Sequence, residues 1–179
     1  MQKTKGIYCI IGKSGSGKTT LANELEKYGY NSIESYTTRP KRFDNETGHI
    51  FITEEEFDQL KDMCAYVKYN GYRYGATSEQ ANNSALYVID PDGLDYFKLH
   101  YTGNKNICTI YIDCPWYTRL HRMLKRGDGF RQACKRIVLD SKVFAKCKNR
   151  VDFIIENKNK TKATNILRSA ISELENYGE

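Results

Sequence analysis

The first segment whose residue types could do chemistry is a glycine-rich loop near the amino terminus. It runs from Gly12 to Thr19 and matches the pattern G-x-x-x-x-G-K-[ST] at every fixed position. Glycines let the backbone curl until several N–H groups point at phosphate oxygens, and a following helix adds the positive end of its dipole. Lys18 can reach the β- and γ-phosphates, and the hydroxyl of Thr19 can bind Mg²⁺. The motif predicts a nucleoside triphosphate site formed by Ser14, Gly15, Ser16, Gly17, Lys18, Thr19 and Thr20.

A second candidate site is the hydroxyl-rich and basic run SYTTRPKR, residues 35–42. Arg39 and Arg42 stand three residues apart in it. Two guanidinium groups can hold one phosphate by paired hydrogen bonds, which lysine cannot reproduce. A solvated basic loop is the alternative interpretation of this run taken alone. Together with the glycine-rich loop, the run predicts a second bound anion that accepts the phosphate.

Basic charge is concentrated late in the chain. Residues 117–150 contain eleven Lys or Arg and two Asp, although the whole chain carries a net charge of only +6. Arg122 and Arg126 are four residues apart and share a helix face, and Arg136 follows across the turn at 127–129. Such a segment could close over phosphates and exclude water. A solvated helix face and a nucleic-acid track are the alternatives, but only three aromatic residues are interleaved with these charges.

The elements that must position these residues alternate between strands and helices. Alternation of this kind predicts a parallel sheet with helices on both faces. Thr53 and Glu56 form a capping-box pattern, and Asn70-Gly71 predicts a hairpin turn between aromatic-rich flanks. We expect strands at 5–11, from 32–33 into Tyr36, and at 85–89, 107–112 and 153–155. We expect helices at 18–28, from 54 to about 63, 116–126, from the 127–129 turn to about 148, and 161–177.

Taken in order, the motifs resemble those of the guanylate kinase family of nucleoside monophosphate kinases. The match in spacing and order covers roughly residues 4–176. It rests on the loop from Gly12, the run from Ser35, the GYRYG run from Gly71, the strand that ends at Asp90, RMLKRG from Arg122 and DFIIEN from Asp152.

The resemblance implies an α/β P-loop NTPase fold in one domain, residues 1–179, with two small subdomains. The core would comprise about 1–34, 84–120 and 150–179, the acceptor-binding insert about 35–83, and the lid about 121–149. The implied activity is ATP-dependent phosphorylation of a nucleoside monophosphate to the diphosphate, with Mg²⁺, and GMP or dGMP is the best single expectation. The alternatives are a P-loop kinase of other acceptors, such as another nucleotide or a polynucleotide end, and a non-catalytic binding module. Intact Gly17, Lys18 and Thr19 favour an enzyme.

Individual roles follow from the same resemblance. The residues that match Arg39 and Arg42 hold the acceptor phosphate, and the tyrosine that matches Tyr74 donates to it. Ser35 would lie near the acceptor base, and Asp90 near the metal and the acceptor. Lys18, Arg126 and Arg136 would stabilise charge on the transferred group, while Arg122 would bind ATP.

Four positions depart from the family pattern around the acceptor. His49 stands near a usual phosphate-binding tyrosine, and Val88 replaces the first acid of the usual strand end. Lys68 falls about where a glutamate usually reads guanine, and Ala76 replaces a small hydroxyl residue. Because such polar contacts discriminate between bases far better than pocket size does, the acceptor base and the ribose preference stay open.

Composition limits the remaining possibilities. The chain has 179 residues, 40% hydrophobic and 28% charged, which argues against wholesale disorder. No apolar run suits a signal peptide or a membrane span, so we expect a cytoplasmic protein with small-molecule nucleotide partners. A nucleic-acid or membrane partner is not expected, and the oligomeric state is open. The six cysteines lack zinc-site spacing and are expected to be reduced thiols.

Overall fold

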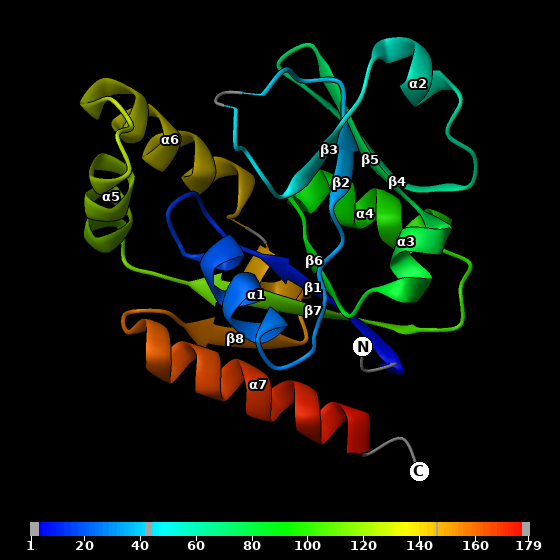
Figure 1. Ribbon diagram of the computed structural model, residues 1–179. Helices are drawn as coiled ribbons and strands as arrows, with labels where there is room; N and C mark the ends of the chain where they lie inside the picture. Colours follow the sequence, from blue (N-terminus) through cyan, green and yellow to red (C-terminus); the bar gives the residue numbers. More distant parts are fainter. Residues whose placement is uncertain (1–3, 42–43, 146, 177–179) are drawn as a thin grey trace.

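A computed structural model describes residues 4–41, 44–145 and 147–176 of the chain. Its central sheet is wholly parallel and has the order β6-β1-β7-β8 (Figure 1). Tyr8 in the middle of β1 pairs with Leu86 on one side and with Cys108 on the other. The predicted α/β fold with a parallel sheet is confirmed. The strands are β1 (Gly6–Ile11), β6 (Leu86–Val88), β7 (Asn106–Asp113) and β8 (Phe153–Glu156).

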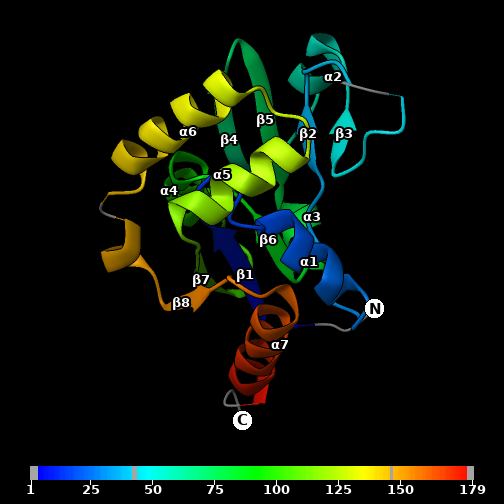
Figure 2. The ribbon, with the colours of Figure 1, turned by 90° about the vertical axis from the view of Figure 1, so that its left-hand side faces the viewer.

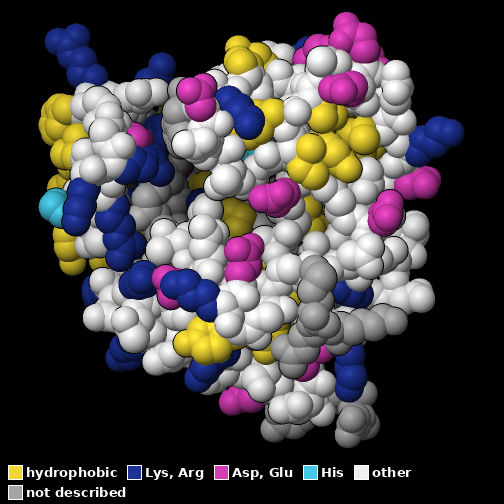
Figure 3. Space-filling model, viewed as in Figure 1, with side chains coloured by type: hydrophobic (Ala, Val, Ile, Leu, Met, Phe, Trp, Pro, Cys, Tyr) yellow, Lys and Arg dark blue, Asp and Glu magenta, His cyan; other side chains and the backbone are white. Residues whose placement is uncertain are grey.

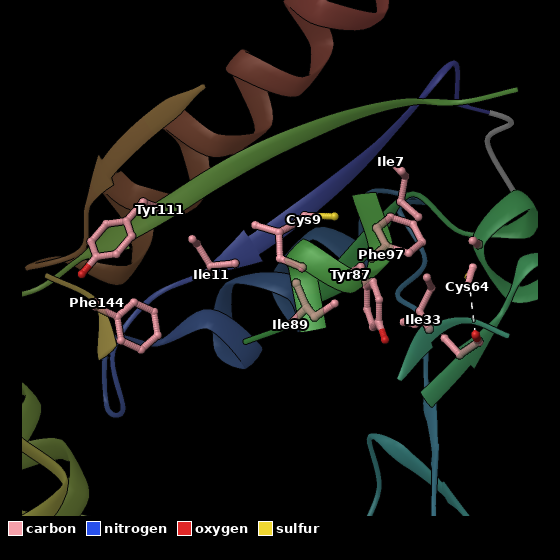
Figure 4. Packing of buried hydrophobic residues seen from close by; sticks show 14 residues of the cluster. Ile7, Cys9, Ile11, Ile33, Cys64, Tyr87, Ile89, Phe97, Tyr111 and Phe144 are labelled. Carbon is pink, nitrogen blue, oxygen red and sulfur yellow. Dashed lines mark hydrogen bonds between the residues drawn. The ribbon is translucent and has the colours of Figure 1, made fainter. Parts of the chain in front are cut away.

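Helices cover both faces of this sheet, which explains why β1 is apolar throughout and completely buried. On one face, Tyr8 and Ile10 belong to a core cluster with residues of α1 (Lys18–Glu26) and α7 (Lys160–Asn176). On the other face, the alternate β1 residues belong to a second cluster, which includes residues of α4 (Pro91–His100) and of a smaller sheet. Figure 4 shows this second cluster, with Ile7, Cys9 and Ile11 of β1 beside Phe97 and Phe144.

The smaller sheet is built entirely from residues 35–77 and has the order β3-β2-β5-β4. Its strands β2 and β3 are parallel, whereas β2–β5 and β4–β5 are antiparallel. Asn70 and Gly71 join β4 to β5 with φ angles of 50° and 85°. Two consecutive positive φ values are the geometry of a tight hairpin turn, so the predicted hairpin is confirmed. The strands are β2 (Ser35–Thr37), β3 (His49–Phe51), β4 (Met63–Tyr69) and β5 (Tyr72–Thr77).

The basic segment forms two helices that lie side by side (Figure 2). They are α5 (Trp116–Lys125) and α6 (Phe130–Val143), joined through Gly127, whose φ is 94°. A short 3₁₀ helix, Cys147–Arg150, follows before β8. The pair stands beside the carboxyl end of β1, at the edge of the sheet from which the glycine-rich loop emerges (Figure 1).

Several predicted bounds are wrong for identifiable reasons. The capping box at Thr53 is present, but α2 (Glu54–Asp58) does not reach Met63, because Asp62 has a left-handed φ of 52° and β4 begins next. The strand expected to begin at residues 32–33 and lead into Tyr36 is present as β2 but begins only at Ser35, and Ser32 forms an isolated bridge to Leu86. Helix α6 ends at Val143 instead of near residue 148. Two helices were not predicted, α3 (Ser78–Asn83) and α4.

Two negative expectations bear on the described residues. No helix within the described ranges is both long and apolar enough to cross a membrane. All six cysteines lie within those ranges and are free thiols, as expected. Burial raises the pKa of the Cys64 thiol to about 11, so this buried sulfur stays protonated at neutral pH.

Candidate active site

The glycine-rich loop lies between β1 and α1, as predicted, and borders a cleft of about 500 Å³ that we call the donor pocket. Gly17 has a φ of +95° and immediately precedes α1, so the first N–H groups of that helix point toward the pocket. A side chain at Gly17 would collide with the amide of Asn157. The described lining residues are Ser14, Gly15, Gly17, Lys18, Thr19, Thr20, Arg122, Arg126, Arg136, Asn157 and Lys160.

Lys18 is folded back onto its own loop. Its Nζ donates to the carbonyl of Gly12 at 2.7 Å. Burial lowers the pKa of Lys18 to about 8, although the Asp140 and Asp90 carboxylates oppose this effect. A cation held against backbone carbonyls and partly stripped of water is well placed to turn to phosphate oxygens when they arrive.

Arg122 and Asn157 form hydrogen bonds that hold the backbone of the glycine-rich loop. The Arg122 guanidinium donates to the Ser16 carbonyl at 3.2 Å and to the Asn157 carbonyl at 3.0 Å. The Asn157 amide also donates to the Ser16 carbonyl, at 2.8 Å. Ser16 is fully buried, its N–H donates to Lys13, and it is not among the residues that line the donor pocket. Arg122 therefore supports the loop as well as lining the pocket, a task that the sequence did not indicate.

Arg126 and Arg136, the two arginines that the resemblance assigns to a lid, both lie against one carboxylate. Asp128 accepts from Arg126 through both of its oxygens, at 2.8 and 2.7 Å, and lies 3.5 Å from Arg136. The hydrogen bonds to Asp128 raise the pKa of Arg126. In Figure 3, Lys and Arg side chains border a hollow on the left of the view, where Figure 1 places α5 and α6. Positive charge is thus concentrated at the mouth of the donor pocket.

A second cleft, of about 540 Å³, opens between the central sheet and the smaller sheet, and we call it the acceptor pocket. It brings together four of the five residues predicted to bind the acceptor, namely Ser35, Arg39, Tyr74 and Asp90. The fifth, Arg42, lies outside the described residues.

Arg39 is buried in the wall of the acceptor pocket and is paired with Glu46. The two groups meet by a double hydrogen bond of 2.8 and 3.1 Å, with side-chain exposures of 10% and 9%. This pairing is the main cause that raises the pKa of Arg39, so the guanidinium is permanently charged. The buried Arg39 Nε has no hydrogen-bond partner among the described residues and is a donor that an incoming phosphate could use.

The other acceptor-side residues are fixed by local structure. Asp90 is the N-cap of α4, and its Oδ1 accepts from the Gly93 N–H at 2.8 Å. The Ser35 hydroxyl donates to the Tyr87 hydroxyl at 3.3 Å. The ring of Tyr74 meets the edge of His49 at 5.6 Å between centroids. These residues therefore contribute one carboxylate, three hydroxyl-bearing side chains and an imidazole to the lining of the acceptor pocket, together with Arg39.

The wall expected to read the base differs from the one predicted. His49 and Val88 line the acceptor pocket, but Lys68 is exposed near the hairpin tip and does not. Ala76 is fully buried and does not line it either. Neither Lys68 nor Ala76 therefore contributes a side chain to the lining of the acceptor pocket. On β4 the pocket is instead lined by Ala65, Tyr66, Val67 and Tyr69.

The two pockets meet at Thr19, which is the single described residue that lines both. Within the described ranges, no three or more His, Cys, Asp or Glu side chains gather to hold a metal ion. The exposed Thr19 hydroxyl at this junction fits Mg²⁺, a hard cation that takes oxygen ligands and commonly shares them with substrate phosphates. Such an ion would be held by Thr19 and by substrate oxygens rather than by a protein cage.

Comparisons with known proteins agree with this arrangement. The family model described as guanylate kinase matches residues 4–174. A guanylate kinase of Helicobacter pylori is 23% identical over 97% of this chain and 90% of its own length, and one of Malacoplasma penetrans is 25% identical over 93% and 92%. A crystal structure of guanylate kinase from Anaplasma phagocytophilum aligns with a TM-score of 0.67 at 16% identity, and covers 98% of this chain and 88% of that one. The structural likeness supports the fold.

Proposed function

We propose a function from the premise that the chain belongs to the guanylate kinase family, as the family match over residues 4–174 shows. The chain is accordingly a nucleoside monophosphate kinase by family. The activity we infer is transfer of the γ-phosphate of ATP to the phosphate of a bound nucleoside monophosphate, which yields ADP and the nucleoside diphosphate. GMP or dGMP is the leading acceptor, because the relatives that match 97% and 93% of the chain are guanylate kinases.

One observation carries this proposal: the donor and acceptor pockets meet at Thr19. Each pocket is lined by arginine, Arg126 and Arg136 on one side and Arg39 on the other. Two anionic substrates held in these pockets would face each other with their phosphates at the junction. That arrangement suits direct in-line transfer without a protein-bound intermediate, in which positioning supplies most of the rate enhancement.

The roles of the side chains follow from their positions. The N–H groups at the start of α1 and the Lys18 ammonium hold the donor phosphates. Arg39 and Tyr74 aim the acceptor phosphate, with Arg42 as a further proposed ligand. Arg126 and Arg136 stabilise the charge that develops on the transferred group. Thr19 would hold Mg²⁺, which would supply positive charge that offsets the charge of the ATP phosphates. No general base is needed, because the attacking phosphate oxygen is already ionised at neutral pH.

We also assign regions to these tasks. Residues 35–83 form the acceptor side and residues 121–149 the lid, while the remaining segments form the core. This division is supported by the smaller sheet, which lies within 35–83, and by the lid arginines, which come from α5, α6 and the turn between them.

The base preference rests on the wall formed by β4 and by Ser35. On β4, Ala65 and Val67 offer no hydrogen bond from their side chains, but Tyr66 and Tyr69 carry hydroxyls. Ser35 and Tyr87 offer a further pair of hydroxyls that either donate or accept. A hydroxyl pair tolerates more than one base edge, so we expect discrimination to be weaker than a fixed carboxylate would give.

The test is a coupled assay of ADP formation from ATP and Mg²⁺ with GMP, dGMP, AMP, CMP, UMP and dTMP. Arg39→Ala is the acceptor-site variant, and Arg150→Ala is the control because Arg150 is exposed and lines neither pocket. Turnover that Arg39→Ala abolishes and Arg150→Ala preserves supports the proposal. Absence of turnover with every monophosphate, despite ATP binding, refutes it and leaves polynucleotide ends or a non-catalytic binding role.

A further inference from the structure

A buried ion pair joins the two helices of the basic segment to the glycine-rich loop. Arg119 of α5 is 2% exposed and Asp140 of α6 is 14% exposed, and their Nη2 and Oδ2 atoms are 2.7 Å apart. Burial lowers the pKa of Arg119, and the nearby Asp140 carboxylate opposes that shift. The transfer chemistry proposed above uses neither residue.

Both members of the pair bind Ser14, the third residue of the loop. The Arg119 Nε donates to the Ser14 carbonyl at 2.8 Å, and the Ser14 N–H donates to Asp140 Oδ2 at 2.7 Å. The Ser14 hydroxyl is 3.4 Å from Asp140 Oδ1. The backbone donor, the backbone acceptor and the side chain of one loop residue are thus held from more than a hundred positions away. We call Arg119, Asp140 and Ser14 the brace.

The backbone of α5 also rests directly on the next loop residue. A Cβ at Gly15 would lie 2.7 Å from the carbonyl oxygen of Arg119, and Gly15 has a φ of +75°. No side chain fits at that distance. The brace therefore works at a true contact between α5 and the loop, not across a gap.

Helical spacing connects the brace to the lid arginines. Arg119, Arg122 and Arg126 are three and four residues apart, so they lie along one side of α5 as it ends. Arg136 precedes Asp140 by one turn on α6. Arg122, Arg126 and Arg136 all line the donor pocket. The bonds from Arg119 and Asp140 to Ser14 therefore also fix the positions of the three arginines that line the donor pocket from the same sides of α5 and α6.

We propose that Arg119 and Asp140 are positioning residues that clamp Ser14 and hold α5 and α6 over the donor pocket before nucleotide arrives. As far as it concerns phosphoryl transfer, this inference rests on the function proposed above. When the lid closes, its motion is then confined to the segment between Arg119 and Asp140, around the turn at 127–129. Removal of the brace loosens the loop and lets Arg126 and Arg136 drift from the donor phosphates.

The test variant must remove the brace and keep the fold. A single apolar replacement leaves one buried charge without its partner, which is strongly destabilising. The double variant Arg119→Met with Asp140→Leu removes both charges together and keeps similar volume, and such replacements often preserve stability. The matched control is Arg150→Met with Asp95→Leu, which removes an exposed pair of 3.2 Å outside both pockets.

The primary readout is calorimetric titration with Mg²⁺ and a non-hydrolysable ATP analogue. We expect the Kd to rise about tenfold or more in the brace variant and to stay within about twofold in the control. In steady-state kinetics the KM for ATP rises similarly, whereas the KM for the monophosphate is unchanged. Mere loss of folded protein would lower the apparent kcat and leave both KM values unchanged.

Each result decides the matter. An unchanged Kd in a folded brace variant overturns the inference. If the double variant does not fold, Asp140→Asn replaces it, because asparagine keeps the shape of the side chain and an acceptor oxygen but loses the charge. A rise in the Kd of this variant then supports the inference, and an unchanged Kd overturns it. If even the unaltered protein turns over no monophosphate, the proposed function fails, and the calorimetry still tests the brace by itself.

Discussion

Asp128 occupies the position between the two lid arginines that ATP phosphates would take, so its removal should tighten ATP binding. Its two oxygens accept from Arg126 at 2.8 and 2.7 Å, and Arg136 lies 3.5 Å away. For phosphates to bind these guanidinium groups, the carboxylate must release them. The change Asp128→Asn keeps the shape of the side chain and abolishes its charge, and with it most of this competition.

The exposures of the pair set the size of the effect. The Arg126 side chain is 53% exposed and that of Asp128 is 16% exposed. Ion pairs near water contribute about 0.2–1 kcal/mol, and the double hydrogen bond places this one toward the upper end. Because 1.4 kcal/mol corresponds to about a factor of ten, a gain of about 1 kcal/mol tightens the Kd of ATP by about fivefold at most.

The assay is isothermal titration with Mg²⁺ and a non-hydrolysable ATP analogue at low and at high salt. We expect a Kd about two- to fivefold lower in Asp128→Asn, with the difference shrinking at high salt because exposed charges are screened. Asp95→Asn is the control, since Asp95 forms an exposed pair with Arg150 and lines neither pocket. Weaker ATP binding in Asp128→Asn would refute the reasoning and show that Asp128 orients the arginines instead of competing for them.

Three further changes probe other parts of the site. Arg39→Lys keeps the charge but loses the planar fork that meets Glu46, so steady-state kinetics should show the KM of the acceptor rising about tenfold and that of ATP by less than about twofold. Arg122→Ala removes charged hydrogen bonds to backbone carbonyls, including that of Ser16 at 3.2 Å; a loss of about 2 kcal/mol lowers the melting temperature by about 4–8 °C in thermal scans. Folding lowers the pKa of Lys18 from 10.5 to about 8, so the charged lysine destabilises the folded state at pH 7, and Lys18→Met removes that free-energy penalty. Urea titrations should show the unliganded variant to be more stable at pH 7. The gain is at most about 3 kcal/mol, because the Lys18 side chain is partly exposed.

The sign of the Lys18 effect gives it a distinctive pH dependence. Between pH 8 and 10.5 the folded protein releases the Lys18 proton while the unfolded chain keeps it. The wild-type penalty therefore fades as pH rises through that window, and the advantage of Lys18→Met should disappear by about pH 10. A difference that stays constant with pH contradicts this account. Arg150→Ala is the control for the other two variants. If it raised the KM of the acceptor as much as Arg39→Lys, or lowered the melting temperature as much as Arg122→Ala, the corresponding prediction would be contradicted.

Features encoded by neighbouring residues were predictable from the sequence. The glycine-rich loop and the Asn70-Gly71 turn each require a particular local backbone conformation, and the residue types at these positions indicate that conformation. The hairpin was found for this reason. The α4 helix was not predicted, although the sequence contains a usable signal for it. Asp90 is an N-cap residue, and Pro91 directly after it suits the first turn of a helix.

Features that depend on pairing between distant segments were not predictable. Arg119 pairs with Asp140, 21 positions later in the chain, and its Nε donates to the Ser14 carbonyl across 105 positions, so both partners are settled only when the chain has folded. Lys68 is exposed and lies outside the acceptor pocket, whereas its neighbours Val67 and Tyr69 line it. Which residues of β4 face the pocket depends on how the smaller sheet packs beside the central sheet, and a single sequence does not show that packing.

The meeting of the two pockets at Thr19 has a consequence for how this chain can change over evolutionary time. Among the described residues, Thr19 alone lines both pockets, and part of the acceptor wall comes from a separate sheet. Substitutions on that sheet alter what is accepted without touching the residues that grip ATP. The acceptor wall is thus free to diverge under selection for a new substrate, while the donor side is inherited unchanged. The departure at His49 on β3, beside an intact Gly12–Thr19 motif, is the record such a history would leave.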